Sequence, residues 1–306
     1  MLTRKSKIFF KKILSFFSVI RGYNIWVLAL AQYLSAIFIL APEKRALEII
    51  LDWRLFLIVL ASTLAIASGY IINNFYDAKK DLINRPKKAM IDRLVSQETK
   101  LKVYFGINFI VAFLMIFISW RAVLFFSTYI FLIWLYSHKL KKIFLLGNLT
   151  AAILAVLPFF GVLMYYKNFY QVIFAHATFL FLLILIRELI KDLENVKGDL
   201  IADYKTIPVV FGLQTAKTVI TLLVGATLIP VYYLTNVFFV GYMDTYFYVS
   251  LLLLLFFVLQ LWKIQSKPGF LKLHLLLKFI IVAGVFSIVL IEPEVLLHGK
   301  KIILTP

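Results

Sequence analysis

The sequence contains no cysteine and few acidic residues, and both shortages limit what the chain can be. Without cysteine among its 306 residues, it forms no disulfide bond. Only 15 Asp and Glu stand against 33 Lys and Arg, which gives a formal net charge of +18. Such a charge can indicate nucleic-acid binding, but 63% of the residues are hydrophobic. We therefore attribute the cations to membrane topology and to attraction for anionic lipid head groups, and expect no nucleic-acid partner.

The sequence also lacks the short alternating segments of a membrane β-barrel. Instead, apolar windows of about 18 residues or more recur, which is the length that crosses a bilayer as a helix. The windows are 23–41, 55–76, 102–120, 122–138, 146–165, 169–186, 216–236, 245–262 and 273–291. Each is expected to be helical, because hydrocarbon offers no partner for free backbone groups. The predicted fold is all-α: a polytopic bundle of about nine transmembrane helices around a central cavity, in a single membrane domain over residues 23–306.

The distribution of cations predicts the orientation of the chain. Residues 1–22 mix Lys with Phe and Ile at helical spacing, which favours a basic amphipathic segment along the membrane surface. Most Lys and Arg fall on one side of the bilayer if the N-terminus is cytoplasmic. We therefore expect an integral protein of a bacterial-type inner (cell) membrane, with the N-terminus inside and the C-terminus outside.

The few acidic residues gather in two segments on the predicted cytosolic side. Nine of the 15 lie there: Asp77, Asp81, Asp92 and Glu98, then Glu188, Asp192, Glu194, Asp199 and Asp203. Oxygen-bearing side chains recur with the same spacing in both segments: Asn74, Asp77 and Asp81, then Asp192, Asn195 and Asp199. Steps of three or four residues keep side chains on one face of a helix. We expect each pattern to occupy the end of a span and the loop that follows it.

Carboxylate and amide oxygens grouped in this way are ligands that suit Mg²⁺, which typically uses one or two carboxylates alongside substrate phosphates. Two such groups facing one another could hold metal ions around one diphosphate. Nearby cations, Arg85, Lys141 and Lys191, could contact the remaining phosphate oxygens. A single Asp at a helix end is usually a solvated terminus, but repetition of the pattern on the same side favours a site that faces the cytosol.

These segments resemble the motifs of the UbiA-type membrane prenyltransferases. The first acidic motif of that family, Asn-Asp-x-x-Asp-x-x-x-Asp followed by Asn-Arg-Pro, is similar to residues 73–81 and 84–86. The second is similar to Lys191, Asp192, Asn195, Asp199 and Asp203, followed by KTIPVVFG at 205–212. IRGYN at 20–24 and LYSHKLKKIFLLGNLTAA at 135–152 extend the resemblance. Asn74 and Asn195 stand where the family usually has Asp, and an amide brings a metal no charge.

The resemblance implies a Mg²⁺-dependent enzyme that transfers a prenyl group from a prenyl diphosphate to a lipophilic acceptor through an allylic carbocation. The implied metal ligands are Asn73, Asn74, Asp77, Asp81, Asp192, Asn195, Asp199 and Asp203. Among them, Asp77, Asp81, Asp192 and Asp199 are the implied catalytic residues. Arg85, Lys141 and Lys191 are the implied diphosphate ligands, and Asn24 is an implied substrate contact.

The acceptor is less well specified by the sequence. RELIKDLENVKGD at 187–199 most resembles the branch that attaches a geranylgeranyl group to geranylgeranylglyceryl phosphate. Aromatic acceptors of quinone biosynthesis, of the 4-hydroxybenzoate or naphthoate type, are the alternative. A different class, the ion-coupled secondary transporter, requires acidic residues near the bilayer midplane. No carboxylate lies deep inside a predicted span, so we favour diphosphate chemistry.

Overall fold

The computed structural model describes residue 13 and residues 15–297, and this part of the chain is helical with no strand. Nine of its segments are long and apolar enough to cross a bilayer. Their main helices are α2 (Gly22–Ser35), α4 (Trp53–Tyr76), α7 (Gln97–Ile116), α8 (Trp120–His138), α9 (Leu146–Tyr166), α10 (Gln171–Ile201), α11 (Ile207–Ala226), α13 (Asp244–Lys263) and α14 (Lys267–Ser287). The predicted all-α membrane fold is confirmed.

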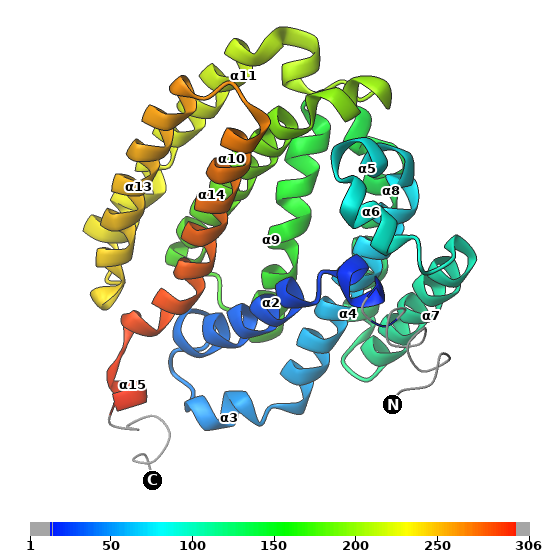
Figure 1. Cartoon of the computed structure of the whole chain (residues 1–306). Helices are drawn as coiled ribbons and strands as arrows, with labels where there is room; N and C mark the ends of the chain where they lie inside the picture. Colours follow the sequence, from blue (N-terminus) through cyan, green and yellow to red (C-terminus); the bar gives the residue numbers. More distant parts are fainter. Residues whose placement is uncertain (1–12, 14, 298–306) are drawn as a thin grey trace, which may run out of the picture.

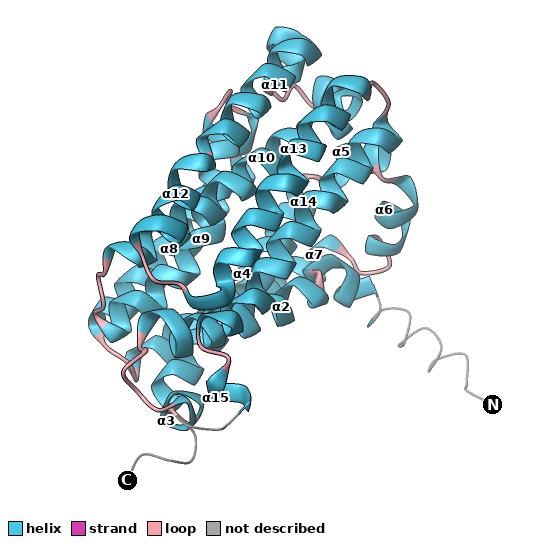
Figure 2. Ribbon diagram, turned by 90° about the vertical axis from the view of Figure 1, so that its left-hand side faces the viewer, coloured by secondary structure: helices cyan, strands magenta, loops and turns pink. Residues whose placement is uncertain are grey.

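Five shorter α-helices complete the described part of the chain, one of them inside the seventh span and the others outside the spans. They are α3 (Ala46–Ile50), α5 (Ala78–Asn84), α6 (Pro86–Asp92), α12 (Leu228–Tyr232) and α15 (Glu294–Leu297). Helices α3 and α15 lie at one end, and α5 and the first turns of α11 lie at the opposite end (Figures 1 and 2). This second end is the one that carries both acidic segments.

Helix α4 packs closely against its neighbours because small residues line its buried face. Ala61, Ala65 and Ser68 are almost fully buried, and small side chains let helix backbones approach one another within a membrane. Polar contacts join three helices at the same level. Gln32 of α2 donates hydrogen bonds to Ser62 Oγ of α4 (3.1 Å) and to the Pro158 carbonyl oxygen of α9 (2.9 Å).

Proline inside α9 is accommodated by a neighbouring helix. Pro158 has no N–H, so the Leu154 carbonyl one turn earlier loses its helical partner. Tyr129 of α8 donates its hydroxyl to that carbonyl oxygen at 2.9 Å. The exchange of a backbone bond for a side-chain bond keeps the polar group satisfied where water is absent.

The sequence prediction was wrong about the lengths of the sixth and seventh spans. We expected the second acidic segment in a loop after residue 186, but α10 continues to Ile201 and carries it on a helix. At 31 residues, α10 is roughly 46 Å long, well beyond a bilayer core of roughly 30 Å. Helix α11 begins at Ile207 and is interrupted at Gly212, whose φ of 84° is left-handed.

The basic N-terminal segment expected over residues 1–22 lies mostly outside the described residues, so it and the boundary of the membrane domain stay predictions. Residues 15–20, which the structure describes, are helical. Ser18 Oγ donates to Asp92 Oδ1 at 3.0 Å, which joins this helix to the end of α6.

Candidate active site

Two backbone interruptions bring the first acidic motif around the end of the bundle. Helix α4 ends at Tyr76 and α5 begins at Ala78, and Asn73, Asp77 and Asp81 follow one another at steps of one turn. A second interruption at Arg85 precedes Pro86, which opens α6. Helix α5 packs on α10. A side chain at Gly198 of α10 would collide with the Asn84 side chain, so glycine permits the close approach of these two helices.

A polar pocket lies between the two motifs. Its walls come from the start of α2, the junction of α4 and α5, the turn after α8, α10, and the turn after α10. The lining residues are Arg21, Asn73, Asp77, Lys80, Asp81, Asn84, Arg85, Tyr136, Lys141, Ile143, Gly147, Asn148, Glu188, Lys191, Asp192, Asn195, Tyr204, Lys205 and Thr206. Charged and amide side chains of both motifs therefore share one cavity.

Asp77 is a centre of hydrogen bonding in this pocket. Its Oδ1 accepts from Lys141 Nζ at 2.6 Å and from the Tyr204 hydroxyl at 2.6 Å. Lys141 also donates to Asn73 Oδ1 at 3.0 Å. Lys141 lies in the turn after α8, and Tyr204 lies in the turn after α10. One carboxylate thus joins three separate connections at this end of the bundle.

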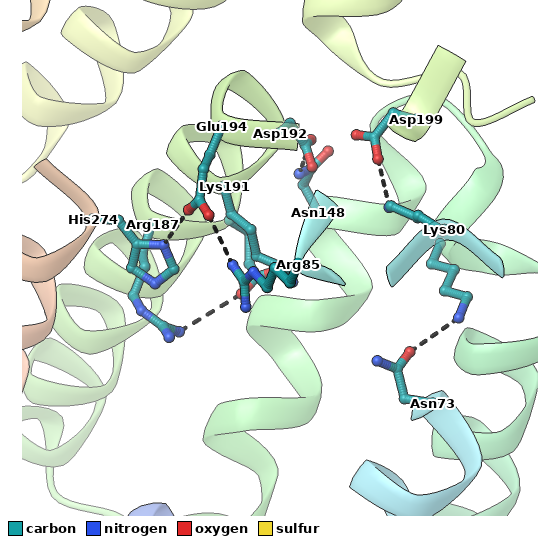
Figure 3. Close-up of polar contacts among 12 residues, drawn as sticks. Asn73, Lys80, Arg85, Asn148, Arg187, Lys191, Asp192, Glu194, Asp199 and His274 are labelled. Atoms are coloured by element: carbon teal, nitrogen blue, oxygen red, sulfur yellow. Dashed lines mark hydrogen bonds and ion pairs between the residues drawn. The ribbon is translucent and has the colours of Figure 1, made fainter. Parts of the chain in front are cut away.

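The carboxylates of α10 are also paired (Figure 3). Asp199 is fully buried and forms an ion pair with Lys80 of α5. Asp192 Oδ2 accepts a hydrogen bond from Asn148 Nδ2 of α9 at 2.7 Å. Glu188 Oε2 accepts from Lys191 Nζ at 2.6 Å. The pocket holds its negative charge next to ammonium and amide groups, which offsets the cost of burying that charge.

The two carboxylates near the end of α4 differ in their acidity. Burial alone would raise the pKa of Asp77, but Lys141 and Lys80 hold that pKa below its usual value. Burial raises the pKa of Asp81, and the neighbouring charge of Asp77 raises it further. Burial lowers the pKa of Lys141 despite its contact with Asp77. Of these two carboxylates, Asp81 therefore gains more from an additional cation.

The side-chain oxygens of the pocket fit a divalent cation that prefers oxygen ligands. The Asn195 Oδ1 atom is buried without a hydrogen-bond partner. The Asp81 carboxylate lines the same pocket and has no hydrogen bond or ion pair to another described residue. Within the described residues, no three Asp, Glu or His side chains converge as a ready-made metal cage. This arrangement suits Mg²⁺, which takes few protein carboxylates and completes its shell with water and phosphate oxygens.

An apolar pocket lies further toward the opposite end of the bundle. It is bounded by α2, α9, α10, α13 and α14, and its walls are almost entirely aliphatic and aromatic side chains. Phe160, Phe179, Leu183 and Phe247 are among them. The two pockets share no lining residue; one offers charged groups and the other an oily surface, which are the two surroundings that a ligand with a charged head and a hydrocarbon tail requires.

The combination of facing acidic motifs and a nine-span bundle leads to comparison with known proteins. The sequence profile described as the UbiA prenyltransferase family matches residues 25–279, which is most of the chain. This chain belongs to the UbiA prenyltransferase family. It is therefore an integral membrane enzyme of the prenyltransferase class, and the transporter alternative is not supported.

Relatives of this UbiA-family chain carry one name repeatedly. The chain is 28% identical over 261 residues to digeranylgeranylglyceryl phosphate synthase of Methanobrevibacter smithii, covering 78% of this chain and 89% of that protein. It is 33% identical over 187 residues to the protein of the same name from Methanosphaera stadtmanae, covering 59% and 66%. These matches agree with the branch that the second acidic motif resembles.

Solved UbiA structures share the fold. A structure of digeranylgeranylglyceryl phosphate synthase superposes with a TM-score of 0.67 at 20% identity, covering 91% of this chain and 97% of that one. A UbiA homologue from Archaeoglobus fulgidus, bound to DMAPP and Mg²⁺, superposes with a TM-score of 0.66 at 15% identity, covering 90% and 99%. At these identities the likeness establishes the architecture.

Three of the predicted site residues lie away from the polar pocket of this UbiA-family chain. Asn74 is buried on another face of α4, where its Nδ2 donates to Asp92 Oδ2 (3.0 Å) and its Oδ1 accepts from Lys100 Nζ (2.8 Å). Asp203 is exposed in the turn after α10, with a left-handed φ of 57°. Asn24 donates to the Tyr70 hydroxyl at 3.1 Å. The placement of Asn74 corrects the predicted spacing: the face toward the pocket carries Asn73, Asp77 and Asp81.

The other predicted residues are gathered at the site. Asn73, Asp77, Asp81, Arg85, Lys141, Lys191, Asp192 and Asn195 line the pocket, and Asp199 joins it through Lys80. Arg85 is held by Glu194 of α10, whose other oxygen lies 3.1 Å from His274 Nδ1 of α14 (Figure 3).

Sequence reasoning missed three residues that shape the pocket, Lys80, Asn148 and Tyr204, and placed Glu188 in the second acidic segment without giving it a role at the site. Lys80 follows Asp77 by three residues, close to one helical turn, and this spacing could have identified it. Asn148 and Tyr204 come from separate segments, and no periodic pattern marks them.

Proposed function

We propose that this prenyltransferase transfers a geranylgeranyl group from its diphosphate to geranylgeranylglyceryl phosphate, with Mg²⁺ as cofactor. The observation that carries the proposal is the shared pocket between two acidic helices, with carboxylates and lysines in contact. The recurrent name of the curated relatives supports the acceptor. The solved homologue with bound DMAPP and Mg²⁺ supports the donor class and the metal.

Asp77, Asp81, Asp192, Asn195 and Asp199 would hold Mg²⁺. When bound there, the ion supplies Lewis-acid stabilisation of the departing diphosphate charge. Lys141 and Lys80 now neutralise Asp77 and Asp199. The two ammonium groups would also offer hydrogen bonds to phosphate oxygens of the donor. Lys191 and Arg85 line the same pocket and add further donors.

The bond between C1 and its oxygen then breaks, and the electron pair leaves with the diphosphate. The allylic cation that forms is stabilised by aromatic faces near the pocket, for which Tyr76 and Tyr204 are placed: Lys141 Nζ lies 5.9 and 6.0 Å from their ring centroids. The hydrocarbon tail extends among the apolar walls of the bundle. The acceptor hydroxyl oxygen attacks C1, and its proton passes to the released diphosphate, which completes the transfer.

The positive-inside distribution supports a pocket that faces the cytosol. The connections that surround it include the segment from Lys79 to Lys88 and the turn from Lys139 to Lys142. We propose a cytoplasmic N-terminus on this basis.

The deciding experiment supplies purified protein with Mg²⁺, geranylgeranyl diphosphate and one acceptor at a time. The acceptors are geranylgeranylglyceryl phosphate, 4-hydroxybenzoate and dihydroxynaphthoate, and products are identified by mass. We expect product with the glyceryl phosphate and none in EDTA. Product with an aromatic acceptor alone would select the alternative branch, and full turnover in EDTA would remove the metal.

A further inference from the structure

A chain of hydrogen bonds connects α14 to the polar pocket. His274 Nδ1 of α14 lies 3.1 Å from Glu194 Oε2 of α10, and Glu194 Oε1 accepts from Arg85 Nη2 at 3.0 Å (Figure 3). An ionised carboxylate only accepts hydrogen bonds, so the imidazole donates to Glu194 as the guanidinium does. Arg85 lines the polar pocket, whereas Glu194 and His274 do not. The two outer residues therefore reach the pocket through Arg85.

The three side chains differ in burial. Those of Glu194 and His274 are 3% and 10% exposed, and that of Arg85 is 31% exposed. A buried charge within a membrane helix is costly without partners, and both oxygens of Glu194 have one. The bond to Glu194 uses Nη2 of Arg85, and a guanidinium carries five N–H groups. Arg85 is thus anchored on one side and keeps N–H groups for a ligand in the pocket.

Helix α14 also holds the backbone beside Arg85. Lys267 Nζ donates to the Asn84 carbonyl oxygen at 2.7 Å. Asn84 is the last residue of α5, and Arg85 is the interruption between α5 and α6. Lys267 and His274 are seven residues apart, which places them two turns apart on one face of α14. One face of this helix therefore fixes both the backbone and, through Glu194, the side chain at the interruption.

The contact with Glu194 also keeps Arg85 from a nearby carboxylate. Asp81 and Arg85 are four residues apart, a spacing at which opposite charges commonly pair on a helix. Both line the polar pocket, yet among the described residues the ion-pair partner of Arg85 is Glu194 and not Asp81. An Arg85 side chain released by Glu194 would have Asp81 within its reach. The two pocket residues would then neutralise each other instead of binding a ligand.

We propose that Glu194 and His274 are positioning residues, which hold the Arg85 guanidinium in the orientation that receives the diphosphate of the prenyl substrate. The inference rests on the proposed function in one respect: the ligand of the pocket is a prenyl diphosphate. A long side chain that is already ordered loses less conformational entropy when its ligand binds. Glu194 and His274 thus strengthen diphosphate binding without touching the substrate, and they leave Asp81 open.

The test measures binding of the prenyl diphosphate without an acceptor. The probe is geranylgeranyl thiolodiphosphate, an unreactive analogue with sulfur in place of the bridging oxygen, titrated with Mg²⁺ into the full chain in detergent. His274→Phe keeps a ring but removes the N–H group, and it should weaken binding about tenfold, the value of a hydrogen bond to a charged group. His274→Asn offers an N–H group near the position of Nδ1 and should bind within about twofold of wild type.

A double-substitution cycle separates positioning from a general structural role. Arg85→Ala should weaken binding of the analogue by about ten- to a hundredfold, because a charged contact with phosphate is lost. Adding His274→Phe to Arg85→Ala should cause no further loss, since His274 acts only through Arg85. Additive losses would overturn the proposal, because His274 would then support binding independently of Arg85.

Glu194→Asp provides a second route to the same test if His274→Phe does not fold. Aspartate keeps the charge but is shorter by one methylene group, so it cannot reach both Arg85 and His274. The same loss, with the same dependence on Arg85, is expected. Lys272→Gln is the control on α14: Lys272 is exposed, and the variant should bind the analogue as wild type does. A comparable loss in this control would overturn the assignment to His274.

Turnover gives an independent measurement. His274→Phe should raise the KM for the prenyl diphosphate and leave the KM for the acceptor unchanged, and an equal rise in both would contradict the proposal. Failure of the proposed function gives a different result, because wild-type protein would then not bind the analogue at all. Tight binding by wild type, with unchanged affinity in both His274→Phe and Glu194→Asp, would reject the positioning role alone.

Discussion

At the polar pocket, Asp77 and Asp199 lie at helix ends where water is scarce, and each contacts a lysine. A buried carboxylate without a partner is strongly destabilising. The lysines offset the charge of these carboxylates, and in the proposed reaction they become ligands of the diphosphate. The same side chains can thus serve folding and substrate binding in turn.

The Asp77→Asn variant should lose prenyl transfer by about a hundredfold or more, because the amide removes the charge that binds both Lys141 and a metal ion. The measurement is the initial rate at saturating donor and Mg²⁺, with size-exclusion chromatography to confirm folding. Glu98→Gln is the control, because Glu98 is exposed and pairs with Lys102 on the surface. Wild-type rates for Asp77→Asn would remove this carboxylate from the mechanism.

The pH dependence should respond to Lys141. The pKa of Asp77 is held low chiefly by Lys141, so Asp77 stays ionised until the pH falls through that lowered value. The Lys141→Met variant leaves burial less opposed and raises the pKa of Asp77. The acidic limb of kcat/KM should therefore move to higher pH in the variant. A profile that keeps its acidic limb in place would show that another group controls it.

Asn73 and Asn74 are adjacent in sequence but should behave differently on substitution. Asn74→Ala leaves Asp92 and Lys100 short of a buried partner and should cost about 1–3 kcal/mol of stability. Asn73→Ala should lower the transfer rate and leave thermal stability nearly unchanged, because Lys141 keeps its bond to Asp77. Thermal unfolding and rates of both variants test this; a larger stability loss for Asn73→Ala would contradict the placement.

The residue types at the site could be predicted from the sequence, but the direction in which each side chain points could not always be predicted. Asn73 and Asn74 differ by 100° around α4, and the motif does not say which one faces the pocket. Tertiary contacts decide it, because Lys100 and Asp92 of other helices attract Asn74. Tyr204 was missed for a similar reason: its role depends on a turn that only folding brings beside Asp77.

At the scale of elements, the approach of α5 to α10 sets the width of the pocket. Gly198→Ala should displace the Asn84 side chain that packs between the two helices, because the added methyl group would collide with it. We expect a loss of about 1–3 kcal/mol in stability and reduced transfer. Gly106→Ala in α7 is the control, since a methyl group there meets no atom within 4 Å. A Gly198→Ala variant as stable and active as wild type would contradict this packing.

Hydropathy located the spans well because each is apolar over about 18 residues or more. It failed at the ends of α10 and α11, where the helix persists through charged residues. Asp192 and Asn195 read as loop residues in a window average, yet they lie on a helix whose polar face lines a cavity. The backbone there satisfies its own hydrogen bonds, and the side chains find partners across the pocket.

At the scale of the whole molecule, topology can be tested directly because the chain has no cysteine. Single cysteines at Glu43 and Ser266, both exposed between spans, should lie on opposite sides of the membrane. A membrane-impermeant maleimide added to intact cells should label Glu43→Cys and leave Ser266→Cys unlabelled until the cells are lysed. The reverse pattern would place the pocket outside.

The two walls of the pocket differ in how they are built. Helix α10 runs unbroken from Gln171 to Ile201, so its acidic residues are part of a rod anchored in the hydrocarbon. The opposite wall is jointed at Asp77 and again at Arg85. Any opening or closing of the site during a catalytic cycle is therefore expected in the wall that is interrupted at Asp77 and Arg85. Substitutions that make the backbone more rigid at these two interruptions should slow product release more than comparable substitutions along α10.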